Sequence, residues 1–327
     1  MKKKTYFITG GTGSFAKKFI ENLLKNKLAK KIIIFSRDEF KQFKMKENDL
    51  IKKNESIIRF LIGDIRDKNR LDFAVQDNID VVIHAAAMKQ VPATEYNPFE
   101  AIQTNIIGAQ NLIEICLKKN IKNILALSTD KAAAPINLYG ATKLTSDKLF
   151  TNANFFKGKS RCKFSVVRYG NVMGSRGSVV PLFLKQKKEK KTFTITDKNM
   201  TRFNITLDES VKFVNMCLSK MKGGEIFVPK IPSYRIMDLL NAIQKNPKIK
   251  IIGIRPGEKL HEEMITESDS LNTQELKSHF VIYPSYKKFN SKIKKIFSYN
   301  SLDNNSFLKV NELKELIIKN LNNLTDD

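Results

Sequence analysis

The sequence predicts an α/β fold, with a Rossmann-type, doubly wound parallel sheet and a smaller C-terminal substrate domain. Three observations predict it. Short apolar runs alternate with helical patterns, the first run leads into a glycine-rich turn, and the alternation weakens after about residue 170. We therefore expect a cofactor-binding domain at 1–170, with a returning segment near 204–228, interleaved with a substrate domain at 171–327.

The composition is that of an ordinary globular protein. The 327 residues are 42% hydrophobic and 28% charged, which suits one large or two modest domains. The formal net charge is +25, but the lysines are spread over the whole chain, and the basic cluster at 185–191 lacks interleaved aromatic residues. This pattern favours a solvated basic surface over a nucleic-acid interface. We expect no nucleic-acid partner, although the charge would attract anionic small molecules.

Neither a membrane span nor a metal site is indicated. Residues 1–4 lead directly into a strand-like run, and no stretch approaches about 18 uninterrupted apolar residues, so we expect a cytoplasmic protein. The cysteines and histidines lack the spacing of a disulfide framework or of metal ligands. They are Cys116, Cys162, Cys217, His84, His261 and His279.

The first element is a strand, turn and helix that together are typical of dinucleotide binding. The run Thr5–Thr9 precedes a glycine-rich turn, and Lys17–Leu24 has helical periodicity. Gly10 permits the tight turn, Gly13 lets backbone N–H groups approach a pyrophosphate, and the helix N-terminus stabilises its charge. The residues expected to contact the cofactor here are Gly10, Gly13, Ser14, Phe15 and Ala16.

The second strand, Ile32–Phe35, bears on the choice of cofactor. An acidic residue at its end would accept the ribose hydroxyls of NAD, whereas the cationic residues found here can hold a 2′-phosphate, which favours NADP. The residues concerned are Ser36, Arg37, Asp38 and Lys41. The alternative is that Arg37 merely pairs with Asp38 on the surface.

The next strands add further expected cofactor contacts. Ile57–Ile62 leads to Asp64, which can accept from the adenine amino group, and to Ile65, which would pack on the ring. Val81–Ile83 opens into a segment whose small residues let the backbone lie against a cofactor. From it we expect cofactor contacts by Ala85, Ala86 and Lys89, with Lys89 also reaching the substrate. Asn105, inside the helical stretch Pro98–Lys119, is expected to hydrogen-bond backbone groups.

The stretch Ser128–Leu144 follows the apolar run Ile124–Leu127, so its polar residues should emerge at the ligand crevice of the sheet. Tyr139 and Lys143 are four apart and share one helix face. A cationic lysine beside a phenol lowers the phenol's pKa towards that of a general base. Asp130 and Lys131 form a second acid/base pair, which indicates more than one proton transfer. The alternative is structural: Tyr139 packs, Lys143 is solvated and Asp130 caps a helix.

Beyond the strand Lys163–Arg168 and the glycine-punctuated loop Tyr169–Pro181, two polar clusters stand out. Arg202 and Arg255 suit a diphosphate, and Glu258 can accept from sugar hydroxyls, with surface ion pairing as the alternative for each. Residues 289–327 are polar, contain one amphipathic segment, Val310–Leu321, and carry no chemistry that the sequence reveals.

Several runs of residues resemble one family over some four-fifths of the chain. The chain is similar to the extended short-chain dehydrogenases/reductases, and within them to the inverting UDP-N-acetylglucosamine 4,6-dehydratases of the pseudaminic acid pathway, with its link to flagellin glycosylation. The runs are T-G-G-T-G-S-F (9–15), S-R-D-E (36–39), H-A-A-A-M-K (84–89), S-T-D-K-A-A-A-P-I-N-L-Y-G-A-T-K-L (128–144), R-Y-G-N-V-M-G-S-R-G-S-V-V-P (168–181), M-T-R-F (200–203), G-G-E-I-F-V-P-K-I-P (223–232) and I-I-G-I-R-P-G-E-K-L-H-E (251–262).

This resemblance implies roles for individual residues. Tyr139, supported by Lys143, would take the C4 hydroxyl proton, and Thr129 would hydrogen-bond the C4 oxygen. Lys131, as a neutral amine with a depressed pKa, would remove the C5 proton, and protonated Asp130 would donate to the C6 hydroxyl. The resemblance further implies a cofactor contact by Val172, substrate contacts by Asn171, Val179 and Val180, regeneration of NADP and a homo-oligomer, a dimer or hexamer.

Three alternatives stay open at this point. A C5-retaining dehydratase is the nearest, although such relatives often have Met in place of Tyr139. A UDP-sugar 4-epimerase would not need the Asp130–Lys131 pair. A dinucleotide-sensing regulator on the same fold would not need the Tyr139–Lys143 couple.

Overall fold

The computed structural model describes residues 3–76, 78–174, 178–286 and 296–320, and its main feature is a nine-stranded sheet. The strands of this sheet are β1 (Lys4–Thr9), β2 (Ala29–Ser36), β3 (Ile58–Ile62), β4 (Val81–His84), β5 (Asn123–Thr129), β6 (Lys163–Tyr169), β10 (Ile226–Pro229), β14 (Thr273–Glu275) and β15 (His279–Ile282). Their order is β14-β15-β10-β6-β5-β4-β1-β2-β3. From β10 to β3 all neighbours run parallel, whereas β15 is antiparallel to both β10 and β14. The predicted doubly wound fold is confirmed.

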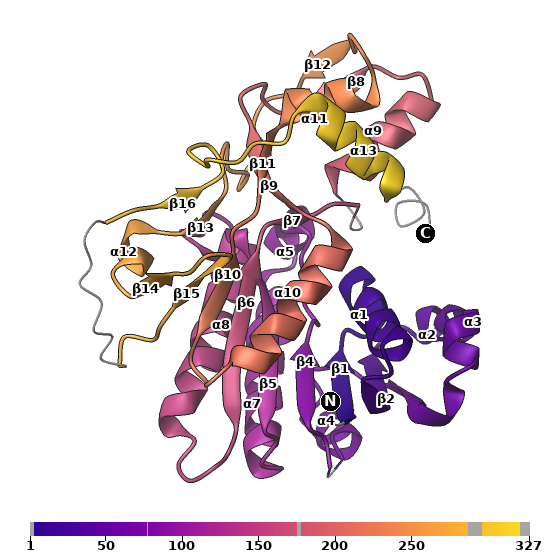
Figure 1. The fold of residues 1–327 in the computed structure, drawn as a ribbon, viewed down its shortest axis with the longest axis vertical. Coiled ribbons are helices and arrows are strands. Elements are labelled where there is room, and N and C mark those ends of the chain that lie inside the picture. Colours follow the sequence, from indigo (N-terminus) through magenta and orange to yellow (C-terminus); the bar gives the residue numbers. More distant parts are fainter. Residues whose placement is uncertain (1–2, 77, 175–177, 287–295, 321–327) are drawn as a thin grey trace.

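Helices cover both faces of this sheet. They are α1 (Ser14–Lys25), α2 (Glu39–Lys46), α3 (Asp49–Lys52), α4 (Lys68–Ala74), α5 (Val91–Tyr96), α6 (Pro98–Ile102), α7 (Gly108–Lys118), α8 (Leu138–Phe156) and α10 (Leu207–Lys220), with short 3₁₀ turns η1 (Glu55–Ile57) and η3 (Asp130–Ala132). Helix α10 packs against α1, and α7 packs against α4 and α8. Figure 1 shows α10 in front of the sheet and α7 and α8 behind it.

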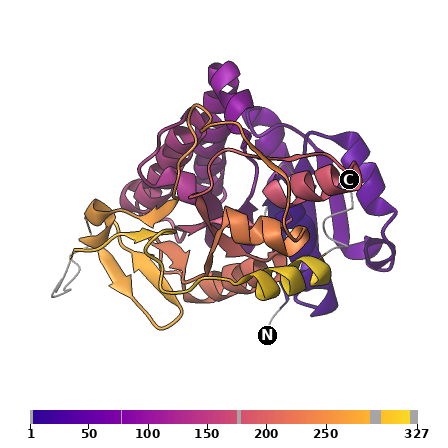
Figure 2. The ribbon, with the colours of Figure 1, turned by 90° about the horizontal axis from the view of Figure 1, so that it is seen from above.

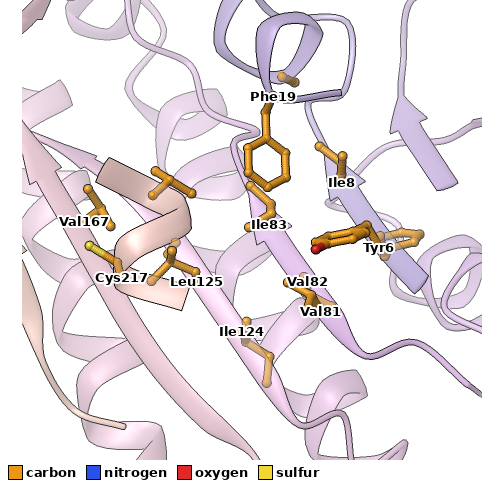
Figure 3. Close-up of a cluster of buried hydrophobic side chains, with 14 of the residues drawn as sticks. Tyr6, Ile8, Phe19, Val81, Val82, Ile83, Ile124, Leu125, Val167 and Cys217 are labelled. Atoms are coloured by element: carbon orange, nitrogen blue, oxygen red, sulfur yellow. The ribbon is translucent and has the colours of Figure 1, made fainter. Parts of the chain in front are cut away.

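The parallel strands are continuous apolar runs because helices bury them on both faces. Phe7, Ile8 and Ile83 are fully buried. Figure 3 shows Phe19 of α1 above β1 and β4, and Cys217 of α10 beside the strands that carry Leu125 and Val167. This core holds the carboxyl ends of β1, β4, β5 and β6 at one edge, where polar residues follow each strand.

The predicted helix Pro98–Lys119 contains an irregular turn. Helix α6 continues into a π-helical segment, η2 (Gln103–Ile107), and then into α7. Such π-helical turns are frequent near functional sites. Asn105 in η2 bonds backbone groups as predicted, but those of the segment after β4: it accepts from Met88 N at 2.8 Å and donates to Met88 O at 2.9 Å. It also donates to Thr142 Oγ1 at 3.0 Å, so one side chain joins three elements.

A smaller unit stands beyond the carboxyl edge of the large sheet (Figures 1 and 2). Its elements are β7 (Asn171–Val172), α9 (Val179–Lys188), β8 (Phe193–Ile195), β9 (Thr201–Ile205), β11 (Ser233–Arg235), α11 (Ile236–Ile243), β12 (Ile249–Ile251) and α13 (Val310–Lys319). All of them except β7 and β9 contribute to a second core, in which Leu313 of α13 packs with Leu239 and Leu240 of α11. Phe203 and Ile205 of β9 belong to the core of the large sheet, and Val172 of β7 packs against it. The amphipathic segment near the C-terminus thus forms helix α13, whose apolar side packs against α11.

The chain passes between the two units more than once. It enters the smaller unit after β6, comes back through α10 and β10, and comes back again through β14 and β15. Beside the large sheet, on the side of β14 and β15 in Figure 1, lie β13 (Glu263–Ile265), α12 (Glu267–Ser270) and β16 (Tyr299–Asn300), with β13 antiparallel to β16. This pairing brings the C-terminal segment beside the carboxyl edge of the large sheet.

Candidate active site

A cavity of about 560 Å³ opens at the carboxyl ends of the parallel strands. Its volume is within the usual range of small-molecule sites. Nearly all residues predicted to contact the cofactor line it, and the structure thereby brings together residues from five strand ends. They are Gly10, Gly13, Ser14, Phe15, Ala16, Ser36, Arg37, Asp38, Lys41, Ile65, Ala85, Ala86, Lys89, Tyr139, Lys143 and Val172.

The glycine-rich turn has the geometry of a phosphate cradle. Gly10 has φ +62°, and a Cβ atom there would lie 2.8 Å from the backbone of Ala85 and Ala86. Gly13 is the N-cap of α1, and the first turn of that helix carries no acidic residue. The helix therefore presents free N–H groups and the positive end of its dipole to the cavity, which fits the pyrophosphate of a dinucleotide.

At the end of β2, Asp38 caps α2 and its Oδ2 lies 2.5 Å from Lys41 Nζ. Arg37 is 55% exposed and lies 3.6 Å from Asp64 Oδ2. Ser36 Oγ accepts from Gln42 Nε2 at 2.9 Å. The guanidinium of Arg37 therefore stands at the cavity rim with room to turn towards a ligand.

Asp64 is the one predicted cofactor residue that does not line this cavity. Its carboxylate accepts from Arg66 Nη2 at 2.7 Å and from Arg66 Nε at 2.9 Å. Burial alone would raise the pKa of Asp64, but Arg66 and Arg37 outweigh it and hold the pKa below its usual range. The carboxylate is thus committed to arginine side chains, whereas its neighbour Ile65 faces the cavity.

A second cavity of about 600 Å³ lies between the large sheet and the smaller unit. It is lined by six of the seven residues predicted to bind substrate, namely Lys89, Asn171, Val179, Arg202, Arg255 and Glu258. The exception is Val180, which is 3% exposed and packs in the second core. Lys89, Lys131 and Asn171 line both cavities, so these residues mark where the two meet. Part of the predicted loop Tyr169–Pro181, at 175–177, is outside the described residues.

Tyr139 and Lys143 both line the first cavity from α8, as their spacing predicts. Lys143 is 3% exposed, so it is not a solvated surface lysine, and its Nζ donates to Leu127 O at 2.8 Å. Burial lowers its pKa, with partial opposition from Asp147. Burial raises the pKa of Tyr139 to about 12, against the charge of Lys131 and a hydrogen bond with Thr129. The prediction that Lys143 lowers the Tyr139 pKa is therefore wrong for this state, because desolvation dominates.

Asp130 and Lys131 lie at the start of η3, directly after β5. Asp130 is fully buried, and its Oδ1 is 3.1 Å from Lys131 Nζ and 2.9 Å from Thr129 Oγ1. Asp130 caps no helix, since Thr129 caps η3 and Asn137 caps α8. Burial raises the pKa of Asp130 even though Lys131 opposes it, which agrees with the predicted protonated donor.

Lys131 has a second carboxylate partner that sequence reasoning missed. Glu262 Oε1 lies 2.9 Å from Lys131 Nζ, and Glu262 is 2% exposed. Burial alone would lower the pKa of Lys131, but Asp130 and Glu262 outweigh it and hold the pKa above its usual range. The predicted depression of the Lys131 pKa is therefore wrong for this state. Glu262 is the last residue of the run 251–262, which is one of the runs that carry the family resemblance. Its place in that run was the one sign in the sequence that Glu262 could belong to the site.

The arginines of the second cavity differ in their surroundings. Arg202 is 6% exposed, and it donates to the carbonyl oxygens of Thr201, Leu260 and Lys259 at 2.7 to 3.0 Å. It lies 3.5 Å from Glu258 Oε1. Arg202 is therefore a buried side chain that holds the backbone of Lys259 and Leu260 in place. The alternative of surface ion pairing does not apply to Arg202. Arg255 is exposed at the cavity rim.

Two further contacts join the segment 257–259 to the catalytic stretch, and sequence reasoning missed both. Asn137 accepts from Gly140 N at 2.7 Å and donates to Gly257 O at 2.7 Å. Lys259 Nζ donates to Ala133 O at 2.7 Å. An asparagine directly before a helix is a common N-cap, so the sequence could have predicted the bond between Asn137 and Gly140. The sequence could not have predicted the bond between Asn137 and Gly257, because these residues are 120 positions apart.

Two kinds of site are not found within the part of the chain that the structure describes. No group of three or more His, Cys, Asp or Glu residues there could hold a metal ion. Likewise, none of the described helices is long and apolar enough to cross a membrane.

The sequence of this chain is similar to those of known proteins along nearly its whole length. Residues 6–284 match the family described as "Polysaccharide biosynthesis protein". A UDP-N-acetylglucosamine 4,6-dehydratase (inverting) of Campylobacter jejuni is 52% identical, covering 96% of this chain and 97% of that protein. A UDP-glucose 4-epimerase of Rickettsia bellii is 40% identical, covering 96% and 95%.

A solved structure agrees with the fold described above. The X-ray structure of Pen from Bacillus thuringiensis superimposes with a TM-score of 0.89 at 41% identity, covering 98% of each chain. The resemblance found in the sequence is confirmed by these matches. The chain therefore belongs to the polysaccharide biosynthesis protein family of extended short-chain dehydrogenases/reductases, together with inverting UDP-N-acetylglucosamine 4,6-dehydratases.

Proposed function

We propose that this protein dehydrates UDP-N-acetylglucosamine across C4 to C6 and inverts C5, giving UDP-2-acetamido-2,6-dideoxy-β-L-arabino-hex-4-ulose. The observation that carries the proposal is the Asp130–Lys131 pair: Lys131 lines both cavities, and its Nζ lies 3.1 Å from Oδ1 of the buried Asp130. An acid and a base on adjacent residues suit removal of one proton and delivery of another to a neighbouring leaving group. The dehydratase relative at 52% identity supports the same reaction.

The cofactor in this proposal is NADP, held in the first cavity. The fit is supported by the close approach of Gly10 to Ala85 and by the start of α1 at the cavity wall. Arg37, with Ser36 and Lys41 beside it, is the candidate for the 2′-phosphate. Bound NADP⁺ would accept the C4 hydride and return it at C6, and its positive ring would favour the Tyr139 phenolate.

Tyr139 is the proposed base for the C4 hydroxyl. Its pKa of about 12 without ligands means that the phenol is neutral before the cofactor binds. The hydrogen bond with Thr129 and the charge of Lys131 already favour the phenolate. In the ternary complex Tyr139 would take the hydroxyl proton, while Thr129 would hydrogen-bond the C4 oxygen as it becomes a ketone. Lys143 would orient the cofactor's ribose beside Tyr139.

Lys131 and Asp130 then carry out the elimination. A C4 ketone acidifies the hydrogen on C5, so Lys131 can remove it once its amine is neutral. Asp130, with its raised pKa, donates a proton to the C6 hydroxyl, which leaves as water. Reprotonation of C5 on the opposite face completes the inversion.

The second cavity would hold the rest of the nucleotide sugar. Lys89 and Arg255 line it and can meet the diphosphate, while Glu258 and Asn171 can bond sugar hydroxyls or the acetamido group. Val179 would pack on the nucleotide. Three residues with proposed roles, Asp64, Asp130 and Val180, line neither cavity; Asp130 adjoins the cavities through Lys131, whose Nζ is 3.1 Å from Asp130 Oδ1.

The test is incubation of the purified protein with UDP-N-acetylglucosamine. A product lighter by one water without added cofactor is expected, and NMR of the initial product should show the inverted C5. A retained C5 would identify a C5-retaining dehydratase. An unchanged mass with a C4 epimer would favour the epimerase reading, which the Rickettsia bellii relative represents. Binding of NADP with no product at all would favour a dinucleotide-sensing regulator.

We further propose that the chain is divided into a cofactor domain at 1–170 and a substrate domain at 171–327. The protein would form a homo-oligomer in the cytoplasm and would bind no nucleic acid. The product would feed pseudaminic acid synthesis and flagellin glycosylation. Light scattering and cell fractionation test the assembly and the location.

A further inference from the structure

The buried carboxylate of Glu262 has no part in the reaction proposed above. Its Oε1 lies 2.9 Å from Lys131 Nζ and 3.7 Å from Arg202 Nε. A buried carboxylate is costly unless cations pair with it, and here Lys131 and Arg202 both lie near Oε1, while Oε2 has no hydrogen-bond partner among the described residues. Glu262 is also among the residues that line the second cavity. It therefore connects the elimination pair to the substrate side of the site.

The C-terminal segment fixes the backbone of Glu262. Ser301 N donates to Glu262 O at 2.8 Å, and Glu262 N donates to Ser301 Oγ at 2.9 Å. Ser301 is fully buried, and its Oγ lies 2.7 Å from Thr201 Oγ1. The adjacent pairing of β13 with β16 holds the same two stretches together. The C-terminal region contains no recognisable catalytic motif, but through Ser301 it fixes the position of Glu262 beside Lys131.

The two carboxylates beside Lys131 are not equivalent. Glu262 faces two cations, and burial is outweighed by Lys131 and Arg202, so its pKa lies below its usual range. Asp130 faces only Lys131 among the described ion pairs, and burial raises its pKa. Arg202 Nε lies 3.7 Å from Glu262 Oε1, whereas Lys131 is the one cation that the described ion pairs give Asp130, so a proton leaving Lys131 would pass to Asp130 and not to Glu262. The charged or titratable groups around Lys131 and its two carboxylates are Asp130, Glu262, Arg202, Lys259, Tyr139 and Tyr234.

We propose that Glu262 is a positioning residue, which holds the amine of Lys131 while one proton passes from Lys131 Nζ to Asp130 Oδ1. The N–H bond breaks with its electron pair left on nitrogen, and an O–H bond forms on the carboxylate. One transfer thus makes both the neutral base for C5 and the acid for the C6 hydroxyl. When the amine takes the C5 proton and Asp130 gives its proton to the departing hydroxide, the original ion pair returns.

This inference rests on the proposed dehydration, and the variant Glu262→Gln tests it. The amide keeps the size of the side chain and an oxygen that can accept from Lys131, but it removes the charge. We expect kcat for water loss to fall by roughly 10²-fold, with a much smaller change in KM, because the amine of Lys131 loses the charged partner that fixes its position while substrate binding is retained. C4 oxidation, followed as reduced nicotinamide, should persist.

The dependence of kcat on pH distinguishes an effect of Glu262 on the Lys131–Asp130 pair from a merely structural role of Glu262. Loss of a negative charge beside Lys131 and Asp130 lowers the pKa values of the pair that shares the proton. Both limbs of the kcat profile should therefore move to lower pH in Glu262→Gln. Ser301→Ala keeps the charge but removes the Oγ that accepts from Glu262 N, while Ser301 N still donates to Glu262 O, so it should lower kcat without moving the limbs.

The matched control is Glu263→Gln, which removes a neighbouring carboxylate that bonds Ser298 Oγ at 2.8 Å. It should retain the wild-type kcat and profile. If Glu262→Gln binds NADP normally yet keeps wild-type kcat and unshifted limbs, or changes only KM, the inference is overturned. If Glu262→Gln does not fold, Ser301→Ala decides: a wild-type kcat in that variant overturns the inference. A wild-type protein that releases no water would instead overturn the proposed function.

Discussion

The backbone of Gly140 lies against the carbonyl oxygen of Lys131, so closely that a Cβ atom at Gly140 would come within 2.2 Å of that oxygen. The contact sits between η3, which carries the elimination pair, and the first turn of α8, which carries Tyr139. Because Gly140 has no side chain, the two segments can approach and both side chains can face one cavity.

Gly140→Ala should separate these segments. We expect a loss of stability of about 1–3 kcal/mol, typical of overpacking a tight contact, and a fall in kcat because Tyr139 and Lys131 no longer converge. Urea unfolding and the water-loss assay measure the two effects. Ala141→Ser, one position along on the exposed side of the helix, should change stability by less than about 0.5 kcal/mol. Equal behaviour of the two variants would contradict the packing argument.

Lys131→Ala should block elimination and leave some C4 oxidation. The methyl side chain cannot remove the C5 proton, so reduced nicotinamide should accumulate after UDP-N-acetylglucosamine is added, and no product lighter by one water should appear. Asp130 and Glu262 would also face each other without their shared cation, which typically costs about 3–5 kcal/mol. Absorbance and mass spectrometry measure the outcome, and normal turnover would remove Lys131 from its role.

Arg37→Ala should reduce discrimination between NADP and NAD. A charge-assisted bond to phosphate contributes about 1.5–3 kcal/mol, so the affinity for NADP should fall by roughly ten-fold or more while that for NAD hardly changes. Titration of the purified protein with each dinucleotide gives the ratio. Lys44→Ala, which removes the same charge from the far end of α2, is the control. A parallel loss for both dinucleotides would argue against a 2′-phosphate contact.

The sequence predicted those parts of the molecule that depend on neighbours along the chain. The alternation of apolar runs predicted the parallel sheet, and the four-residue spacing predicted that Tyr139 and Lys143 share a cavity. The direction of the Tyr139 pKa was missed because desolvation depends on how many atoms surround a group, which spacing does not reveal. Glu262 was missed for a related reason: its contact with Lys131 forms only when distant segments meet.

The last prediction concerns His84, which is 1% exposed and whose Nδ1 lies 2.8 Å from Thr9 Oγ1. Burial, with a smaller effect of Lys143, lowers its pKa to about 3. The folded protein therefore keeps His84 neutral, whereas the unfolded chain protonates it near pH 6.5, so stability falls as pH drops below that value. For one such group the slope approaches about 1.4 kcal/mol per pH unit, or roughly 2 kcal/mol between pH 6.5 and 5.

His84→Asn should remove this contribution to the slope, because its amide does not titrate and can still bond Thr9. Urea unfolding of both proteins across that interval gives the difference directly, and other titrating groups cancel in the comparison. Thr9→Val is the matched control: it loses the hydrogen bond but keeps the imidazole, so it should be less stable at every pH with the wild-type slope. Identical slopes in the wild type and His84→Asn would mean that the imidazole becomes charged inside the folded protein. In that case local opening of the β1 and β4 ends must admit water to His84, at the same edge where the cofactor is proposed to bind.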